Sequence, residues 1–300
     1  MAVSPYKYFE PDRMGRLRNL NLLARQAVEG FITGLHRSPH KGFSVEFTEH
    51  REYTSGDDIR HLDWVAYARS DRYYIKQYEQ ETNLRCYILL DCSASMNYRY
   101  GAGMTKFDYG CYLTACLAYL MSRQQDMVGV VAFDEKVRFH IPPGSTPAHL
   151  DRVFRRLEET RPSNKTAVAS TFHELAATIA KRGLIVIISD LYDDPDEIAK
   201  AFQHFVWKRH QLLVLHVMDP AELDFPFKKI LSFVDMETDE KLQVDPRSVR
   251  DAYVEEVTAF IEKYRKECGD RSIDYVLTRT DTPYDRMLLN YLARRKAAMR

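Results

Sequence analysis

The sequence predicts an α/β fold with a doubly wound, mostly parallel sheet. Two observations predict it: short, continuously apolar runs recur along residues 84–300, and amphipathic helical patterns lie between them. Continuous apolar runs, as opposed to alternating ones, are typical of strands covered on both faces. Strands that alternate with helices of this length are joined by crossovers, and the resulting sheet is parallel.

Five apolar runs supply the strands of the main sheet. They span residues 85–90, 127–133, 184–188, 212–218 and 273–277. Two further segments have the pattern of antiparallel hairpins, one turning across Asp134-Glu135 and the other across Thr238-Asp239. We therefore expect a parallel sheet with two hairpin insertions.

Four segments between these strands have helical patterns. Residues 107–121 are apolar almost all round, which indicates a central buried helix. The other three repeat apolar residues at i, i+3, i+4 and i+7. These are Leu150, Val153, Phe154 and Leu157; Phe172, Leu175, Ala176 and Ile179; and Ile198, Ala201, Phe202 and Phe205.

The first 83 residues differ from the remainder. Residues 12–35 have a helical pattern, and residues 36–83 are rich in charged and aromatic side chains. Leaving so many aromatic rings in water is unfavourable, so we expect an N-terminal helical and irregular extension packed on the main domain. The expected domains are 1–83 and 84–300, and the run 73–80 is expected to pair antiparallel with the first main strand.

Composition narrows the class of protein. The 300 residues include 43 basic and 43 acidic side chains, a balance that argues against a dedicated nucleic-acid-binding protein. The longest apolar runs are too short to span a membrane, and the N-terminus has no apolar core of a signal peptide. Five cysteines without Cys-x-x-Cys pairs fit buried, reduced thiols. These features predict a cytoplasmic protein.

A triplet of oxygen-bearing residues follows the first main strand. Asp91, Ser93 and Ser95 are two apart, so their side chains can point at one centre. Ligands of doubly wound sheets bind beyond the carboxyl ends of strands, and another strand ends in Ser189-Asp190 while a loop carries Thr166. Carboxylate and hydroxyl oxygens suit Mg²⁺ or Mn²⁺ better than zinc.

Other interpretations of the triplet stay open. An Asp or Ser at this place commonly caps the helix that follows. Phosphatases with an aspartyl nucleophile also place it after a strand, but they want a second aspartate where Ser93 stands. The sequence has neither the Gly-x-Ser-x-Gly of a serine hydrolase nor a phosphate-binding Gly-x-x-x-x-Gly-Lys-Ser/Thr loop. A binding module is favoured over an enzyme.

The set Asp91, Ser93, Ser95, Thr166 and Asp190 resembles the metal-ion-dependent adhesion site of von Willebrand factor type A domains. The upstream segment resembles the signature of bacterial proteins in domain-of-unknown-function family number fifty-eight. The matching residues are Glu46, Phe47, Arg51, Tyr53, Gly56, Asp57, Asp58, Arg60, Asp63, Trp64, Ala68 and Arg69. One departure is the loop Ser163-Asn164-Lys165-Thr166, which lacks the glycines usual in the family.

The resemblance implies a von Willebrand factor type A-like fold and one Mg²⁺ (or Mn²⁺) site. Ser93, Ser95 and Thr166 would then touch the metal, and Asp91 and Asp190 would hold it mainly through water. It also implies a partner, a hexameric MoxR-type AAA+ ATPase, and a role in the assembly or activation of other complexes.

We therefore expect a non-enzymatic protein-interaction module, with no membrane span, whose metal accepts an Asp or Glu from a partner protein. The alternatives are a Mg²⁺-dependent phosphotransfer enzyme that uses Asp91 and a degenerate structural domain without metal. Asp57, Asp58 and Asp63 are expected to pair with Arg51, Arg60 and Arg69 as structural ion pairs. His216 is expected to be a hydrogen-bonded core histidine.

Overall fold

A computed structural model describes residues 7–8, 45–54, 62–70, 72–80, 84–101, 103–163, 168–234, 236 and 241–298. Its contacts divide the chain into two compact units. The larger unit combines Met1–Leu35 with Leu84–Arg300, and the smaller one is His36–Asn83. The predicted packing of residues 1–83 on the main domain stays a prediction.

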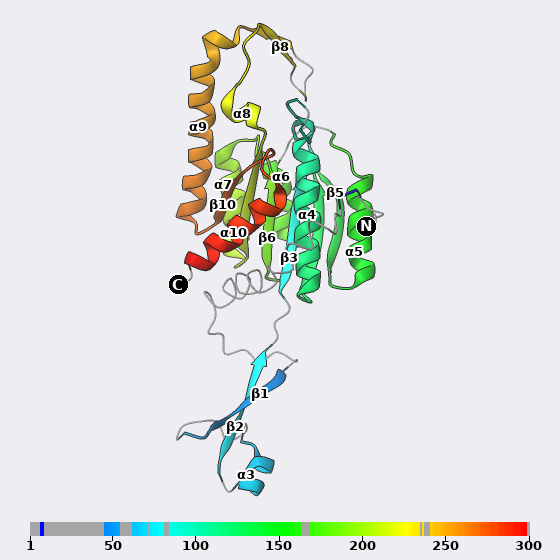
Figure 1. Ribbon diagram of the computed structural model, residues 1–300, viewed down its shortest axis with the longest axis vertical. Coiled ribbons are helices and arrows are strands. Elements are labelled where there is room, and N and C mark those ends of the chain that lie inside the picture. Colours follow the sequence, from blue (N-terminus) through cyan, green and yellow to red (C-terminus); the bar gives the residue numbers. More distant parts are fainter. Residues whose placement is uncertain are drawn as a thin grey trace. The chain divides into compact units, whose positions relative to one another are not determined.

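The larger unit is built on a six-stranded sheet with the order β10-β7-β6-β3-β4-β5 (Figure 1). The strands are β3 (Arg85–Asp91), β4 (Met127–Phe133), β5 (Val137–Gly144), β6 (Leu184–Ser189), β7 (Gln211–Met218) and β10 (Asp274–Arg279). All neighbours run parallel except β4 and β5, which form the hairpin expected across Asp134-Glu135. The mostly parallel sheet is confirmed.

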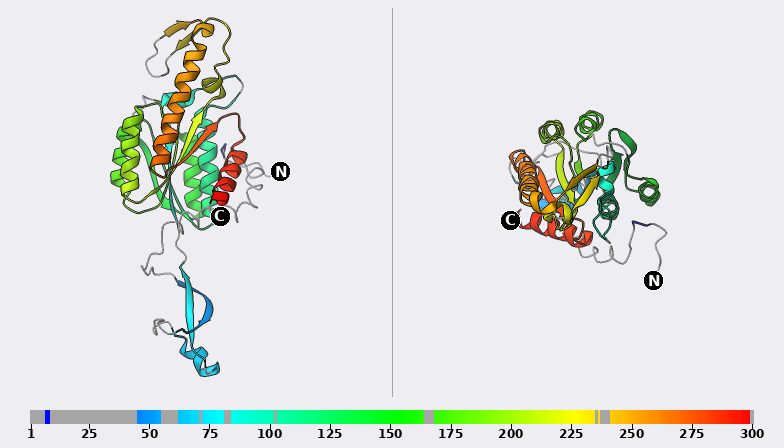
Figure 2. Two further views of the ribbon diagram at one scale, coloured as in Figure 1. Left: turned by 90° about the vertical axis from the view of Figure 1, so that its left-hand side faces the viewer. Right: turned by 90° about the horizontal axis from the view of Figure 1, so that it is seen from above.

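Helices cover both faces of this sheet (Figure 2). One face carries α4 (Lys106–Arg123), α5 (Pro147–Glu159) and α10 (Tyr284–Ala298), and the other carries α6 (Val168–Thr178), α7 (Pro195–Trp207) and α9 (Pro246–Asp270). Strand β3 contributes side chains to the hydrophobic cores on both faces of the sheet. Ile88 and Leu90 lie in the core beneath α4, and Tyr87 and Leu89 lie in the core beneath α6 and α7. This two-sided burial explains why its sequence is continuously apolar.

Helix α4 is the central buried helix that its all-round apolar pattern predicts. Thr105 caps it by accepting a hydrogen bond from the Asp108 amide at 3.0 Å. Gly110 lets the helix approach the sheet closely, because a Cβ there would lie 2.9 Å from Leu90 Cδ1 and 3.2 Å from Ile188 Cγ2. The first turn of α4, which begins with Lys106, is thereby fixed beside the ends of β3 and β6.

The segment between β7 and β10 is longer than the sequence patterns indicate. It contains α8 (Pro220–Asp224), the antiparallel pair β8 (Leu231–Val234) and β9 (Lys241–Val244), and then α9. The hairpin is confirmed, but the apolar pattern does not predict α9. Its buried residues after Pro246 are Ile261, Tyr264 and Cys268, so only the C-terminal part of the helix has an apolar stripe.

The smaller unit contains β1 (Val45–Glu52), α3 (Trp64–Ser70) and β2 (Tyr74–Gln80). Asp63 caps α3, since its carboxylate accepts a hydrogen bond from the Ala66 amide at 3.1 Å. The expected pairing of residues 73–80 with the first main strand is wrong, because β2 pairs antiparallel with β1. Both edges of β3 are occupied, by β4 and β6, and a third strand cannot join it.

Some of the predicted features fall outside the described residues. They are the helix over 12–35, the pairing of Asp57, Asp58 and Arg60, and the position of Thr166. All five cysteines are buried and free, as predicted.

Candidate metal centre

The candidate site lies where the order of the parallel strands reverses. The chain passes from β3 to its neighbour β4 on one side, and from β6 to its neighbour β7 on the other, while β3 and β6 are themselves adjacent. Leu90 of β3 pairs with Ile188 of β6, so Asp91 and Ser189 come next at the same edge. This is the place where ligands bind in doubly wound sheets.

The carboxylate of Asp91 is fully buried and held on both oxygens. Oδ1 accepts a hydrogen bond from the Ser93 amide at 2.9 Å, and Oδ2 accepts one from the Ser189 hydroxyl at 2.6 Å. The Ser189 oxygen in turn accepts a hydrogen bond from the Leu191 amide at 2.9 Å. Leu191 has a φ of 55°, in the left-handed region that residues other than glycine seldom adopt. The orientation of Asp91 is therefore fixed from both strands.

Ser93 and Ser95 present their hydroxyls side by side. A short 3₁₀ turn, Ala94–Asn97, follows Ser93 and brings the two Oγ atoms to 3.1 Å from each other. Ser93 is at the N-cap of this turn but its side chain makes no capping hydrogen bond, so the helix-cap interpretation does not account for it. Adjacent oxygens around an octahedral Mg²⁺ lie about 3 Å apart, because each is about 2.1 Å from the ion. The two hydroxyls fit such a pair.

Asp190 is brought to the same edge but has a cationic neighbour. Its Oδ2 accepts a hydrogen bond from Lys106 Nζ at 2.7 Å, and the same ammonium donates to Glu222 Oε1 at 2.6 Å. Lys106 and Asp190 are both completely buried. Sequence patterns missed Lys106 and Glu222. The available signal was a lysine at the start of a helix that is otherwise apolar.

Among the described residues of this site, the carboxylates outnumber the cations. Asp190 and Glu222 share the ammonium of Lys106, and Asp91 has Asp190 as its charged neighbour. Burial, and then the charge of Asp190, raises the pKa of Asp91 to about 7, although hydrogen bonds from Ser189 and Ser93 oppose the shift. Burial also lowers the pKa of Lys106, but Asp190 and Glu222 outweigh it and the pKa is raised. A buried site with excess negative charge and paired hydroxyls has the donor chemistry of a Mg²⁺ site.

His216 is the hydrogen-bonded core histidine that the sequence predicts. Its Nε2 lies 2.9 Å from the Asp190 carbonyl oxygen and its Nδ1 lies 2.6 Å from the Tyr275 hydroxyl. Burial lowers its pKa to about 4. The ring is therefore neutral at pH 7 and supports the backbone of Asp190.

Thr166 lies in the undescribed segment 164–167, so its place at the site stays a prediction. The residue before that segment does reach the site, because the Ser163 amide donates to the Cys92 carbonyl at 2.9 Å. In the described part of the chain, no three His, Cys, Asp or Glu side chains form a metal-binding group. The candidate set has two such carboxylates, and its other members are hydroxyls.

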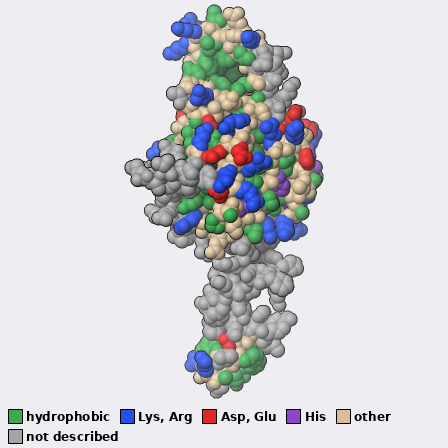
Figure 3. All heavy atoms as spheres, turned by 90° about the vertical axis from the view of Figure 1, so that its right-hand side faces the viewer, with side chains coloured by type: hydrophobic (Ala, Val, Ile, Leu, Met, Phe, Trp, Pro, Cys, Tyr) green, Lys and Arg blue, Asp and Glu red, His purple; other side chains and the backbone are tan. Residues whose placement is uncertain are grey.

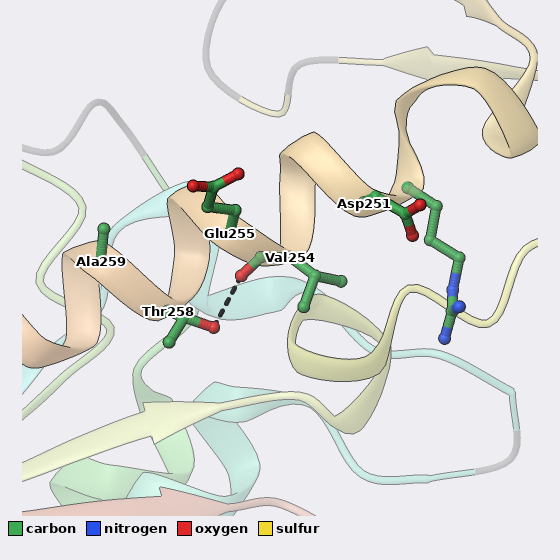
Figure 4. Close-up of a pocket in the computed structure, with 6 residues that line it drawn as sticks. Asp251, Val254, Glu255, Thr258 and Ala259 are labelled. Carbon is green, nitrogen blue, oxygen red and sulfur yellow. Dashed lines mark hydrogen bonds between the residues drawn. The ribbon is translucent and has the colours of Figure 1, made fainter.

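A surface hollow elsewhere does not compete with this site. It lies beside α9 and is lined by Arg250, Asp251, Val254, Glu255, Thr258 and Ala259 (Figure 4). All six residues come from one helix, and the Thr258 hydroxyl is already used, since it donates to the Val254 carbonyl at 2.7 Å. The four predicted metal ligands that the structure describes lie away from this hollow.

The sequence matches the model of one protein family, described as "Protein of unknown function DUF58", over residues 49–262. The chain belongs to this family. An uncharacterized protein of Mycobacterium bovis is 24% identical over 293 residues, covering 96% of this chain and 91% of that protein. An uncharacterized protein of Mycobacterium tuberculosis matches with the same identity and coverage.

Solved structures resemble the chain at lower sequence identity than these mycobacterial proteins. BatB from Bacteroides thetaiotaomicron is 15% identical with a TM-score of 0.47, and covers 72% of this chain and 98% of its own. An aerotolerance-related membrane protein from Bacteroides fragilis is 17% identical with a TM-score of 0.48, covering 72% and 99%. An uncharacterized membrane-spanning protein from Vibrio fischeri is 13% identical with a TM-score of 0.24, covering 71% and 96%.

The expectation of a cytoplasmic protein is contradicted by these membrane-related neighbours, and we withdraw it. Among the helices of the described residues, none has the length and apolar character needed to cross a membrane.

Proposed function

We propose that this protein is a non-enzymatic interaction module that binds Mg²⁺, or Mn²⁺, at the ends of β3 and β6. The ligands are Asp91, Ser93, Ser95, Asp190 and Thr166. One observation carries the proposal: the Ser93 and Ser95 hydroxyls lie 3.1 Å apart beside the buried, doubly hydrogen-bonded carboxylate of Asp91. Such a metal supplies an electrophilic centre that accepts an additional oxygen ligand.

The partner we propose is a protein that offers an Asp or Glu side chain to the metal. Asp91, Ser93 and Asp190 are buried while Ser95 is partly exposed, so an incoming carboxylate would approach from the side of Ser95. Resemblance of the five ligands to a metal-ion-dependent adhesion site, in a von Willebrand factor type A-like domain, supports this mode of binding. The same resemblance suggests a MoxR-type AAA+ ATPase as partner, with the pair acting in assembly or activation of other complexes.

Titration calorimetry with Mg²⁺ tests the metal. The protein should bind one equivalent, and Asp91→Ala should abolish binding because it removes the buried carboxylate. Ser95→Ala should weaken binding with less effect on the fold, since Ser95 is only partly buried. Absence of a saturable site in the wild type would favour the degenerate structural domain.

The phosphotransfer alternative is tested by turnover. Both Asp91 oxygens accept hydrogen bonds, from Ser93 and Ser189, and burial disfavours the charged form that a nucleophile needs. We expect no release of phosphate from ATP or a phosphoester by the pure protein. Turnover that disappears in Asp91→Asn would replace the interaction module with an enzyme.

A further inference from the structure

Lys106 is a completely buried cation in the first turn of α4. It joins two distant segments, since its ammonium bonds Asp190 after β6 and Glu222 in α8. The ring of Tyr192 covers it, with the ammonium 4.7 Å from the ring centre. Burying a lysine is costly even when its charge is paired, because the desolvation penalty can exceed the Coulombic gain, so this arrangement points to a role beyond packing.

We propose that Lys106 competes with the metal ion for Asp190, and that Glu222 sets how strongly it competes. The inference rests on the proposed metal site. The Asp190 carboxylate carries one negative charge. Because the Lys106 ammonium partly neutralises this charge, the carboxylate attracts the metal ion less strongly. When the metal binds, the ammonium shifts its interaction toward Glu222.

Glu222 makes this competition depend on α8. One of its oxygens holds Lys106, and the other accepts a hydrogen bond from the Asp219 amide at 2.7 Å. Asp219 completes the capping box of α8 and also accepts a hydrogen bond from the Tyr100 amide at 3.2 Å. A shift of Lys106 toward Glu222 therefore stiffens α8, the short helix that leads into the β8–β9 hairpin.

The β8–β9 hairpin, which follows α8, exposes hydrophobic side chains at the surface. Ile230 is 63% exposed and Leu242 is 66% exposed, and Figure 3 shows hydrophobic side chains gathered at this end of the unit. Phe233 of β8 packs against Phe225, which directly follows α8, at a ring separation of 5.9 Å. The hairpin is thus in contact with the residue that ends α8, the helix that carries Glu222.

Mg²⁺ affinity of charge variants provides the test, measured by calorimetry on the full chain. Lys106→Met should bind Mg²⁺ about tenfold more tightly, and Glu222→Gln should bind it more weakly, because the ammonium then turns wholly to Asp190. Lys106→Met leaves two buried carboxylates unneutralised and can impair folding. The double variant Lys106→Met/Glu222→Gln loses one charge of each sign and leaves only Asp190 without its cation, which is less damaging to the fold.

The double variant separates competition from general electrostatics. A simple sum of charges predicts unchanged Mg²⁺ affinity, whereas competition for Asp190 predicts tighter binding than in the wild type. Lys7→Met is the matched control, since Lys7 pairs with Asp108 of the same helical turn but is 61% exposed and does not touch Asp190. It should leave the affinity unchanged. Wild-type affinity in the double variant would overturn the role of Lys106.

Hydrogen exchange supplies a second readout. Mg²⁺ should slow amide exchange in α8 of the wild type and should have no such effect in the double variant. Equal protection of α8 in both proteins would contradict the link through Lys106 while leaving the metal site intact. A wild-type protein that binds no Mg²⁺ would remove both proposals.

Discussion

At the scale of single residues, the charge of Asp91 governs the site. Its pKa is raised to about 7 by burial and by Asp190, so without metal the native state binds a proton that the unfolded chain does not. The stability from this neutral form is complete below the unfolded pKa of about 3.9 and is lost as the pH rises through about 7. A divalent cation reverses the loss, because it binds only the carboxylate form.

The stabilising effect of Mg²⁺ should therefore increase with pH. We expect the rise in Tm on adding Mg²⁺ to be small at pH 6 and several degrees larger at pH 8. Thermal unfolding with and without Mg²⁺ measures it, and Asp91→Asn should remove both the metal effect and its pH dependence. An effect of Mg²⁺ that is the same at both pH values would mean that Asp91 does not bind the ion.

The sequence could predict that Asp91, Ser93 and Asp190 lie at one edge of the sheet. Each residue comes at or just after the end of a strand, and the carboxyl ends of parallel strands meet at the same edge. It could not predict Lys106 against Glu222. These residues are far apart in the chain, and their contact depends on where α8 lies after β7. Sequence spacing carries no information on such a contact.

At the scale of elements, the packing of α4 against β3 depends on Gly110. Gly110→Ala adds a methyl group 2.9 Å from Leu90 Cδ1, and the overpacking should outweigh the roughly 1 kcal/mol that alanine contributes to a helix. We expect a net loss of about 1–2 kcal/mol in the free energy of unfolding, measured with denaturant.

Gly269→Ala is the matched control for this substitution. Gly269 lies in α9, and a Cβ at this position would have nothing within 4 Å, so alanine should be neutral or stabilising by up to about 1 kcal/mol. If Gly110→Ala is equally harmless, α4 does not pack on the sheet as closely as the contacts of Gly110 indicate.

The central strands β3, β4, β6 and β7 were predictable because both of their faces are buried. The four apolar helices were predictable because each buries a continuous apolar stripe. Helix α9 was not, since much of it contacts solvent and lacks a long apolar stripe. The prediction for β2 was wrong for another reason. Nearness in sequence favours pairing with β3, but β3 already has two partners, which only the complete sheet order reveals.

At the scale of the whole molecule, all six strands of the main sheet come from residues after Leu84. A chain beginning at Leu84 should therefore fold, with one cooperative transition. Its Tm should be lower by about 5 °C, because it loses Tyr8, whose buried ring packs on Tyr112 and whose hydroxyl donates to Asp108. Circular dichroism and thermal unfolding measure both properties. An unfolded or aggregated product would show that the first 83 residues belong to one continuous core.

The central claim is that β3 and β6 end in a divalent metal site. The most direct measurement is a crystal structure of the full chain grown with Mn²⁺, in which anomalous scattering locates the ion. The account predicts a single strong peak about 2.2 Å from the Ser93 and Ser95 hydroxyls, with Asp91 and Asp190 beside it. No peak at these hydroxyls at saturating Mn²⁺, or a peak only elsewhere on the molecule, would contradict it.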